Sequence, residues 1–157
     1  MKSEIELTLN GSAIAEHCEP RTHLADFVRD QARKTGTHLG CEHGSCGACT
    51  LLLDGEPIRG CLTLAVSCRG RSVTTIEGLE NDEIIVSLRR AFKAEHALQC
   101  GYCTPGMLIT ARDIIQRFQA LNDAELKHEL AGNLCRCTGY VGIVKAIQRV
   151  MRERRGT

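Results

Sequence analysis

Residues 41–49, CEHGSCGAC, place three cysteines in one short stretch and separate them with glycines. With Cys61 beyond them, the spacing is C-x4-C-x2-C followed by a more distant cysteine. This spacing is typical of plant-type [2Fe–2S] sites, whereas zinc sites prefer two short Cys-x2–4-Cys pairs. The pattern therefore favours an iron–sulfur cluster over structural zinc. We call its predicted ligands, Cys41, Cys46, Cys49 and Cys61, the first cysteine set.

The glycines of this stretch fit the same interpretation. Gly40, Gly44 and Gly47 can adopt positive φ and carry no Cβ, so we expect peptide N–H groups to point at the sulfur atoms. Such hydrogen bonds stabilise negative charge and raise a reduction potential. His43 lies among the cysteines, but four thiols already fill the site, so we expect no ligand role for it.

A second group of cysteines lies toward the C-terminus, in QCGYCTPG (99–106) and NLCRCTGY (133–140). Each pair precedes an expected helix start, where free amides and the helix dipole favour thiolates. By spacing alone CxxC with CxC fits zinc equally well. A redox-active CxxC is a third alternative, but the βαβ surroundings it needs are missing. We call Cys100, Cys103, Cys135 and Cys137 the second cysteine set.

Composition restricts the class of protein. The chain has 157 residues, ten cysteines and a formal net charge of +1. Its N-terminus has no hydrophobic signal segment and no stretch is long and apolar enough for a membrane helix, so we expect a cytoplasmic location. In a reducing compartment clustered thiols hold metal more often than they form disulfides. The charge gives no reason to expect nucleic acid as a partner.

The first half of the chain is patterned as strands around one helix. Apolar and polar residues alternate in 4–9, and Asn10-Gly11 and Asp54-Gly55 are hairpin signals. A helix is expected across 23–36, ending at Gly36, and a last strand in 71–77. This α+β pattern is consistent with a small β-grasp domain.

From about residue 83 the apolar residues recur at helical spacing. Thr104-Pro105 predicts a helix start with Thr104 as its cap, and Asn122 or Asp123 caps a shorter helix that stops at Gly132. Four helices and no strand signal predict an all-α bundle. The expected division is therefore 1–76, a junction over 77–83, and 84–157.

With both cysteine sets in place, the chain resembles the small iron–sulfur subunit of the molybdenum hydroxylases. This is the xanthine oxidase family, which includes carbon monoxide dehydrogenase and 4-hydroxybenzoyl-CoA reductase. The resemblance covers nearly the whole length and rests on these motifs in this order: LTLNG, GCEHGSCGACTLLLDG, CLTLAV, TTIEGL, QCGYCTPGM and GNLCRCTGY.

The resemblance implies a ferredoxin-like N-terminal domain and a four-helix domain, with one [2Fe–2S] cluster on each cysteine set. It implies a large molybdopterin-binding subunit and a medium FAD-binding subunit as partners, in a heterotrimer or its dimer. Gln99 and the loop at Cys137 are expected to approach the pterin. Electrons would pass from molybdenum through the second set and then the first set to FAD, and this chain would bind no substrate, nucleic acid or membrane. Cys18 and Cys68 lie outside both sets and are expected to be free thiols.

Overall fold

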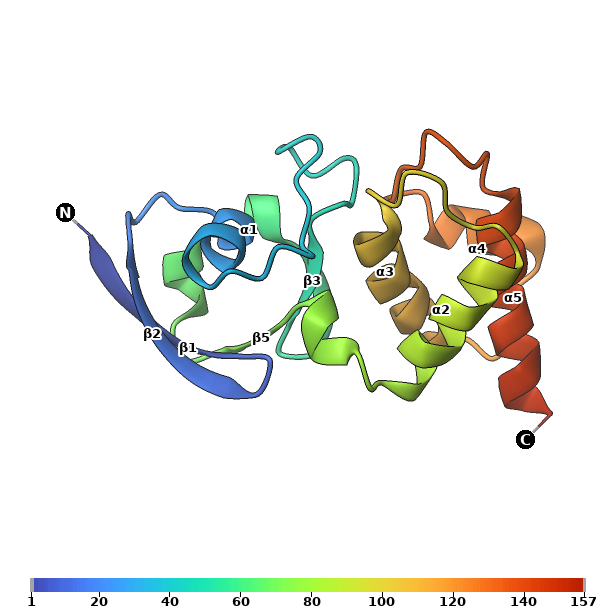
Figure 1. The fold of residues 1–157 in the computed structure, drawn as a ribbon, viewed down its shortest axis with the longest axis horizontal. Coiled ribbons are helices and arrows are strands. Elements are labelled where there is room, and N and C mark those ends of the chain that lie inside the picture. Colours follow the sequence, from blue (N-terminus) through green and yellow to red (C-terminus); the bar gives the residue numbers. More distant parts are fainter. Residues whose placement is uncertain (1, 157) are drawn as a thin grey trace.

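The computed structural model describes residues 2–156 and has a mixed α+β fold with one five-stranded sheet (Figure 1). The strands are β1 (Ser3–Leu9), β2 (Ser12–Cys18), β3 (Thr50–Leu53), β4 (Glu56–Arg59) and β5 (Ser72–Thr74). Their order in the sheet is β2-β1-β5-β3-β4, with β1 parallel to β5 and the other pairs antiparallel. The predicted α+β class, both hairpins and the last strand are confirmed.

The helical segment beside the sheet is shorter than predicted. It consists of α1 (Leu24–Asp26) and a π-helical turn, η1 (Phe27–Gln31), and Arg33 follows with a φ of +56°. Gly36 does not end this helix. Instead, the Gly36 N–H donates to Glu77 Oε1 at 2.8 Å, so this glycine fixes the loop against a later segment.

The second half contains four helices, α2 (Glu83–Ala94), α3 (Thr104–Arg117), α4 (Asp123–Glu129) and α5 (Val141–Arg155). Asp82 caps α2, and Asn122 caps α4 through a reciprocal capping box with Glu125. The predicted start of α3 is confirmed, but the prediction of Thr104 as its cap is wrong. Cys103 occupies the cap position without a side-chain hydrogen bond, and Thr104 already belongs to the helix.

Two short 3-10 turns, η2 (Gly60–Leu62) and η3 (Ala65–Cys68), lie between β4 and β5, and a third, η4 (Ile76–Leu79), leads from β5 to α2. Within residues 2–156, no helix combines the length and the apolar character required to cross a bilayer.

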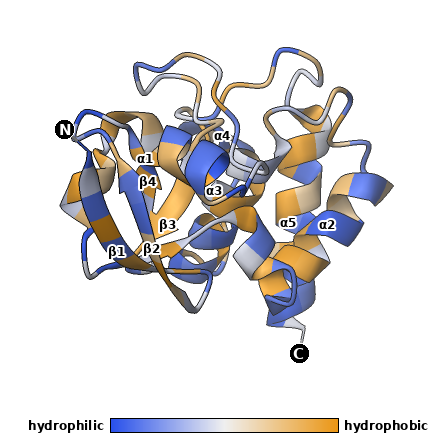
Figure 2. Ribbon diagram, turned by 60° about the vertical axis from the view of Figure 1, so that its left-hand side comes forward, coloured by the Kyte–Doolittle hydropathy of each residue, from blue (hydrophilic) through white to orange (hydrophobic). Residues whose placement is uncertain are grey.

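Each half has its own hydrophobic core. Side chains from β1, β3, η1 and β5 are buried together in the first half, and the apolar faces of α2, α3 and α5 are buried in the second. Figure 2 shows the hydrophobic residues recurring along one side of α2 and α5. Leu52 of β3 packs into the helical core, because α3 lies against β3. The three cysteine-bearing loops consequently emerge along the same edge of the molecule (Figure 1).

Candidate metal centres

In the first set, Cys41 lies beside Cys46. The Cys46 N–H donates to Cys41 Sγ at 3.3 Å, and the two side chains also interact directly. Backbone N–H donors from His43 and Cys46 lower the pKa of the Cys41 thiol to about 6, because they stabilise its thiolate. A thiol of this kind is ready to ligate metal at neutral pH.

Cys49 and Cys61 form the other pair of the first set, and both are buried. Burial and the neighbouring Cys49 raise the pKa of the Cys61 thiol to about 11, while the Gly44 N–H opposes this shift. Cys61 is also close enough to Cys41 for charge on the Cys41 thiolate to raise the pKa of Cys61 further, so the two pairs belong to one neighbourhood.

The second set is paired in the same way. Cys137 Sγ lies 3.5 Å from Cys100 Sγ, and both residues are exposed. Cys103 interacts with Cys135, and both are partly buried. Burial and the adjacent Cys135 raise the pKa of Cys103 to about 12, because a second negative charge beside the first is costly.

Each set offers four thiols arranged as two neighbouring pairs. A [2Fe–2S] cluster takes four thiolates, two on each of its two irons. The number and pairing of the thiols in each set therefore fit such a cluster.

The glycines of the first loop provide the close approach that a cluster needs. Gly44 and Gly47 have φ values of +85° and +72°, as predicted, and the Gly44 N–H points at Cys61 Sγ. Gly40 does not have a positive φ, so that part of the prediction is wrong. Its role is steric, because a Cβ at this position would stand 3.1 Å from Cys46 Sγ.

A hydroxyl beside the second set provides an independent test of fit. Thr104 Oγ1 is buried and has no hydrogen-bond partner among the described residues, and it follows Cys103 directly. A buried polar group without a partner is costly, and one explanation for such a group is an ion or cofactor that binds beside it. An acceptor at the second set would satisfy this hydroxyl.

The two sets are connected by hydrogen bonds that the sequence did not predict. Leu134 N donates to Cys46 O at 2.8 Å, which joins a residue next to Cys135 to a residue of the first set. Beside it, Asn133 is only 2% exposed, donates to Gly47 O at 3.3 Å and accepts from Thr110 at 2.9 Å. The only sequence signal for Asn133 was a polar residue next to glycine, which fits any loop.

Gln99 and Cys137, which the resemblance assigns to the pterin, lie next to each other. Gln99 Nε2 donates to the Cys137 carbonyl oxygen at 3.0 Å, and both residues are exposed. This contact fixes the loop around the exposed pair and leaves the edge of the second set accessible from outside.

The remaining candidates lie outside both sets. Cys18 and Cys68 are buried free thiols within the first core, in agreement with the prediction. His43 Nδ1 contacts the Cys41 carbonyl oxygen at 2.6 Å, so this ring supports the loop backbone.

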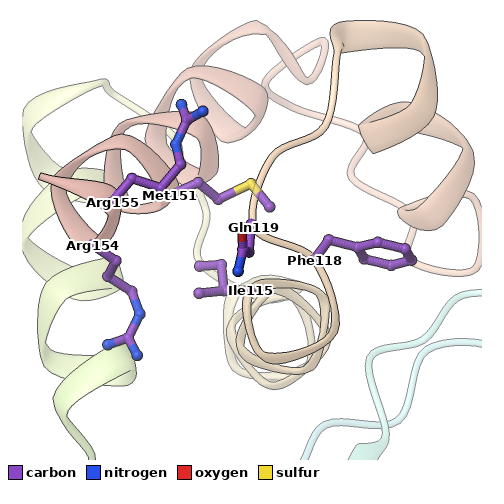
Figure 3. A pocket seen from close by; sticks show the side chains of 6 residues that line it. All are labelled: Ile115, Phe118, Gln119, Met151, Arg154 and Arg155. Atoms are coloured by element: carbon purple, nitrogen blue, oxygen red, sulfur yellow. The ribbon is translucent and has the colours of Figure 1, made fainter.

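A cavity of about 360 Å³ lies between the C-terminal ends of α3 and α5. It is lined by Ile115, Phe118, Gln119, Met151, Arg154 and Arg155. Figure 3 shows the guanidinium groups of Arg154 and Arg155 pointing in different directions, so they do not converge on one ligand. Because both helices begin beside the cysteines and α3 alone is about 20 Å long, this cavity is separate from the metal centres.

Comparison with known proteins identifies the group to which the chain belongs. Residues 75–148 match the family model described as a [2Fe-2S] binding domain. The chain is 51% identical to caffeine dehydrogenase subunit gamma of Pseudomonas sp. (strain CBB1), over 93% of this chain and 89% of that protein. It is 46% identical to the nicotine 6-hydroxylase small subunit of Paenarthrobacter nicotinovorans, over 92% of this chain and 87% of that protein.

The fold comparison agrees. A chain of quinoline 2-oxidoreductase from Pseudomonas putida 86 superposes with a TM-score of 0.90 at 48% identity, covering 99% of this chain and 98% of that one. Identity of this degree over nearly the full length of both chains is enough to assign the family. This protein belongs to the small iron–sulfur subunits of the molybdenum hydroxylase family.

Proposed function

We propose that the chain carries electrons between a large molybdopterin-binding subunit and a medium FAD-binding subunit, in a heterotrimer or its dimer. The first and second cysteine sets would each bind one [2Fe–2S] cluster. The observation that carries the proposal is the meeting of eight thiols in four pairs, two pairs to a set. The clusters supply the one-electron carriers, and this chain supplies their ligands, hydrogen-bond donors and spacing.

The proposed division of the chain follows the two cores. Residues 1–76 would be the β-grasp, ferredoxin-like domain, 77–83 the junction, and 84–157 a four-helix domain that holds the second set. The start of α2 at Glu83, the last residue of the junction, supports this division, as does the burial of two apolar clusters that are separate except for Leu52 and the junction residue Leu79 in the helical one.

The exposure of the thiols supports a direction for the electrons. Cys100 and Cys137 are exposed beside Gln99, so we assign this edge to the molybdopterin. Cys103 and Cys135 lie further inside, and the Leu134-to-Cys46 hydrogen bond leads from them to the first set. The exposed turn at residues 42–45 would then face the flavin subunit.

Exposed apolar side chains gather where partner subunits would cover the clusters. The large hydrophobic residues exposed in the described chain lie within four positions of a predicted ligand, and they are Leu62, Leu64, Leu98, Tyr102, Leu134 and Val141. Apolar surface concentrated in this way is typical of protein–protein contacts. The many free thiols suit the reducing cytoplasm, which we propose as the location of the complex.

Substitution of one ligand tests the assignment. Cys46→Ser should remove the electron paramagnetic resonance signal of the first set and leave that of the second, because the two sets share no ligand. The control is Cys18→Ser, which removes a buried thiol outside both sets and should leave both signals. Iron and acid-labile sulfide are measured in each protein, and zinc without sulfide in the unaltered protein, or retention of both signals in Cys46→Ser, would contradict the proposal.

A further inference from the structure

Thr138 places a hydroxyl group on a predicted ligand of the second set. Thr138 Oγ1 lies 3.1 Å from Cys135 Sγ and accepts a hydrogen bond from the Tyr140 N–H at 3.2 Å. A hydroxyl has one hydrogen to donate. Because its oxygen already accepts from Tyr140, that hydrogen is directed at the Cys135 sulfur, which as a metal-bound thiolate can only accept.

The surrounding loop keeps this hydroxyl in position. Gly139 and Tyr140 both adopt the left-handed conformation, with φ values of +63° and +68°, and within this turn the Tyr140 N–H donates back to Thr138. Its phenol oxygen accepts from the Cys135 N–H at 2.9 Å and donates to the Asn133 carbonyl at 3.0 Å. The Tyr140 phenol therefore fixes the loop to buried Asn133, and the loop holds the Thr138 hydroxyl beside the Cys135 sulfur.

The hydrogen bond acts in the direction that stabilises negative charge. Cys135 is only partly exposed, so a hydroxyl donor 3.1 Å from its sulfur stabilises a thiolate that water reaches poorly. At Cys41 of the first set the donors are mainly backbone amides, those of His43, Cys46 and Ser45, whereas the Thr138 donor is a side chain. Because the Thr138 donor is a side chain, a substitution can remove this hydrogen bond, which is not possible for a backbone amide.

We infer that Thr138 raises the reduction potential of the second-set cluster selectively, by donating its hydroxyl hydrogen to Cys135 Sγ. This inference rests on the proposed binding of a cluster by the second set. Reduction adds one electron to the cluster, and a donor at a ligand sulfur stabilises the more negative, reduced state more than the oxidised one. The cluster predicted to receive electrons first is thereby made a better acceptor.

The size of the effect follows from the strength of such bonds. If about 1.4 kcal/mol of a charge-assisted hydrogen bond is gained only on reduction, the reduced-to-oxidised ratio at a fixed potential changes about tenfold. For a one-electron couple, a tenfold change corresponds to about 59 mV.

The test is a redox titration of the purified complex followed by electron paramagnetic resonance, which gives each cluster its own signal. Thr138→Val should lower the potential of the second-set cluster by about 59 mV and leave the first-set cluster unchanged as an internal reference. Thr138→Ser, which keeps the hydroxyl, should restore the potential. If the valine variant loses the cluster, Thr138→Ala is used instead. Alanine removes the hydroxyl and does not add the methyl group that valine puts in its place, so it should give the same shift.

A matched control separates the sulfur contact from general disturbance of the loop. Thr110→Val removes a hydroxyl that bonds Asn133 Oδ1 and no sulfur, so both potentials should stay unchanged. An unchanged potential in Thr138→Val or Thr138→Ala, a shift of both clusters together, or a serine variant that behaves as valine does would overturn the inference. Absence of iron and sulfide from the unaltered protein would instead refute the proposed function, so the two failures are distinguishable.

Discussion

Gly106 is the position where a single methyl group should drive the two halves of the protein apart. It lies buried in the first turn of α3, and a Cβ there would collide with the Gly47 carbonyl oxygen and stand 3.2 Å from Ala48 O. Both are backbone atoms between Cys46 and Cys49, so they cannot rotate away as a side chain would. The Gly47 carbonyl is further fixed, because it accepts from Thr50 at 2.6 Å and from Asn133 at 3.3 Å.

The sign of the effect of Gly106→Ala distinguishes this contact from simple helix propensity. In a helix, alanine is favoured over glycine by up to about 1 kcal/mol, so without a close contact the variant would be more stable. Overpacking a buried site costs about 1–3 kcal/mol. We expect a net loss of stability, which for a chain of this size lowers the melting temperature by about 2–4 °C per kcal/mol.

Thermal unfolding of the cluster-loaded chain measures this loss, and the magnetic coupling between the two reduced clusters measures their separation. Gly70→Ala is the control, because Gly70 has a φ of +70° and open space around its Cα, so alanine there adds strain of about 1–2 kcal/mol far from the cysteine loops. Both variants should melt earlier, and only Gly106→Ala should change the coupling. A stabilised Gly106→Ala protein, or one with the coupling of Gly70→Ala, would refute the reasoning.

Two other contacts give separate predictions. Tyr102 stacks on His38 with ring centroids 4.6 Å apart and donates its hydroxyl to Leu39 O at 2.6 Å, so Tyr102→Leu should alter the inter-cluster coupling, whereas Tyr102→Phe, which keeps the ring, should change it little. Equal coupling in the two variants would show that the ring does not hold the loops together. Asp82→Ala removes the cap of α2, where the Asp82 carboxylate accepts from two backbone N–H groups, and also breaks the ion pair of Asp82 with Arg112. It should therefore cost at least about 1 kcal/mol in urea unfolding at pH 7. Glu153→Ala, which breaks an exposed i,i+4 pair with Arg149, should cost no more than about 0.5 kcal/mol, and equal losses would contradict the capping role.

The parts of the fold that were predictable depend on neighbours in the sequence. Asn10 and Gly11 adopt φ values of +51° and +82°, the geometry that an Asn-Gly hairpin turn requires, and so the first hairpin follows from two residues. The cap of α4 at Asn122 and the apolar faces of the helices are equally local. The pairing of Asn133 with Gly47, which are 86 residues apart, has no local signal, because neither residue is unusual in its own segment.

The predicted end of the helix across 23–36 is wrong for a related reason. Its apolar residues, Leu24, Phe27 and Val28, are all buried, as their periodicity predicts. The helical segment ends at Gln31, and Gly36 is needed elsewhere, since a Cβ there would stand 2.6 Å from Ile76. A glycine required by a distant contact resembles a helix stop when only the sequence is considered.

Contacts between the halves hold the two cysteine sets in a fixed relation to one another. The first loop is strained at Glu42, because this residue has a φ of +57° and a Cβ that disfavours it. Donors from the helical half stabilise this loop: Asn133 Nδ2 at Gly47 O and Leu134 N at Cys46 O. The loop that carries Cys46 is therefore hydrogen-bonded to the residues that directly precede Cys135. A change in the separation of the two centres would require breaking these bonds, so the fold fixes the distance that an electron must cross by the same contacts that hold the halves together.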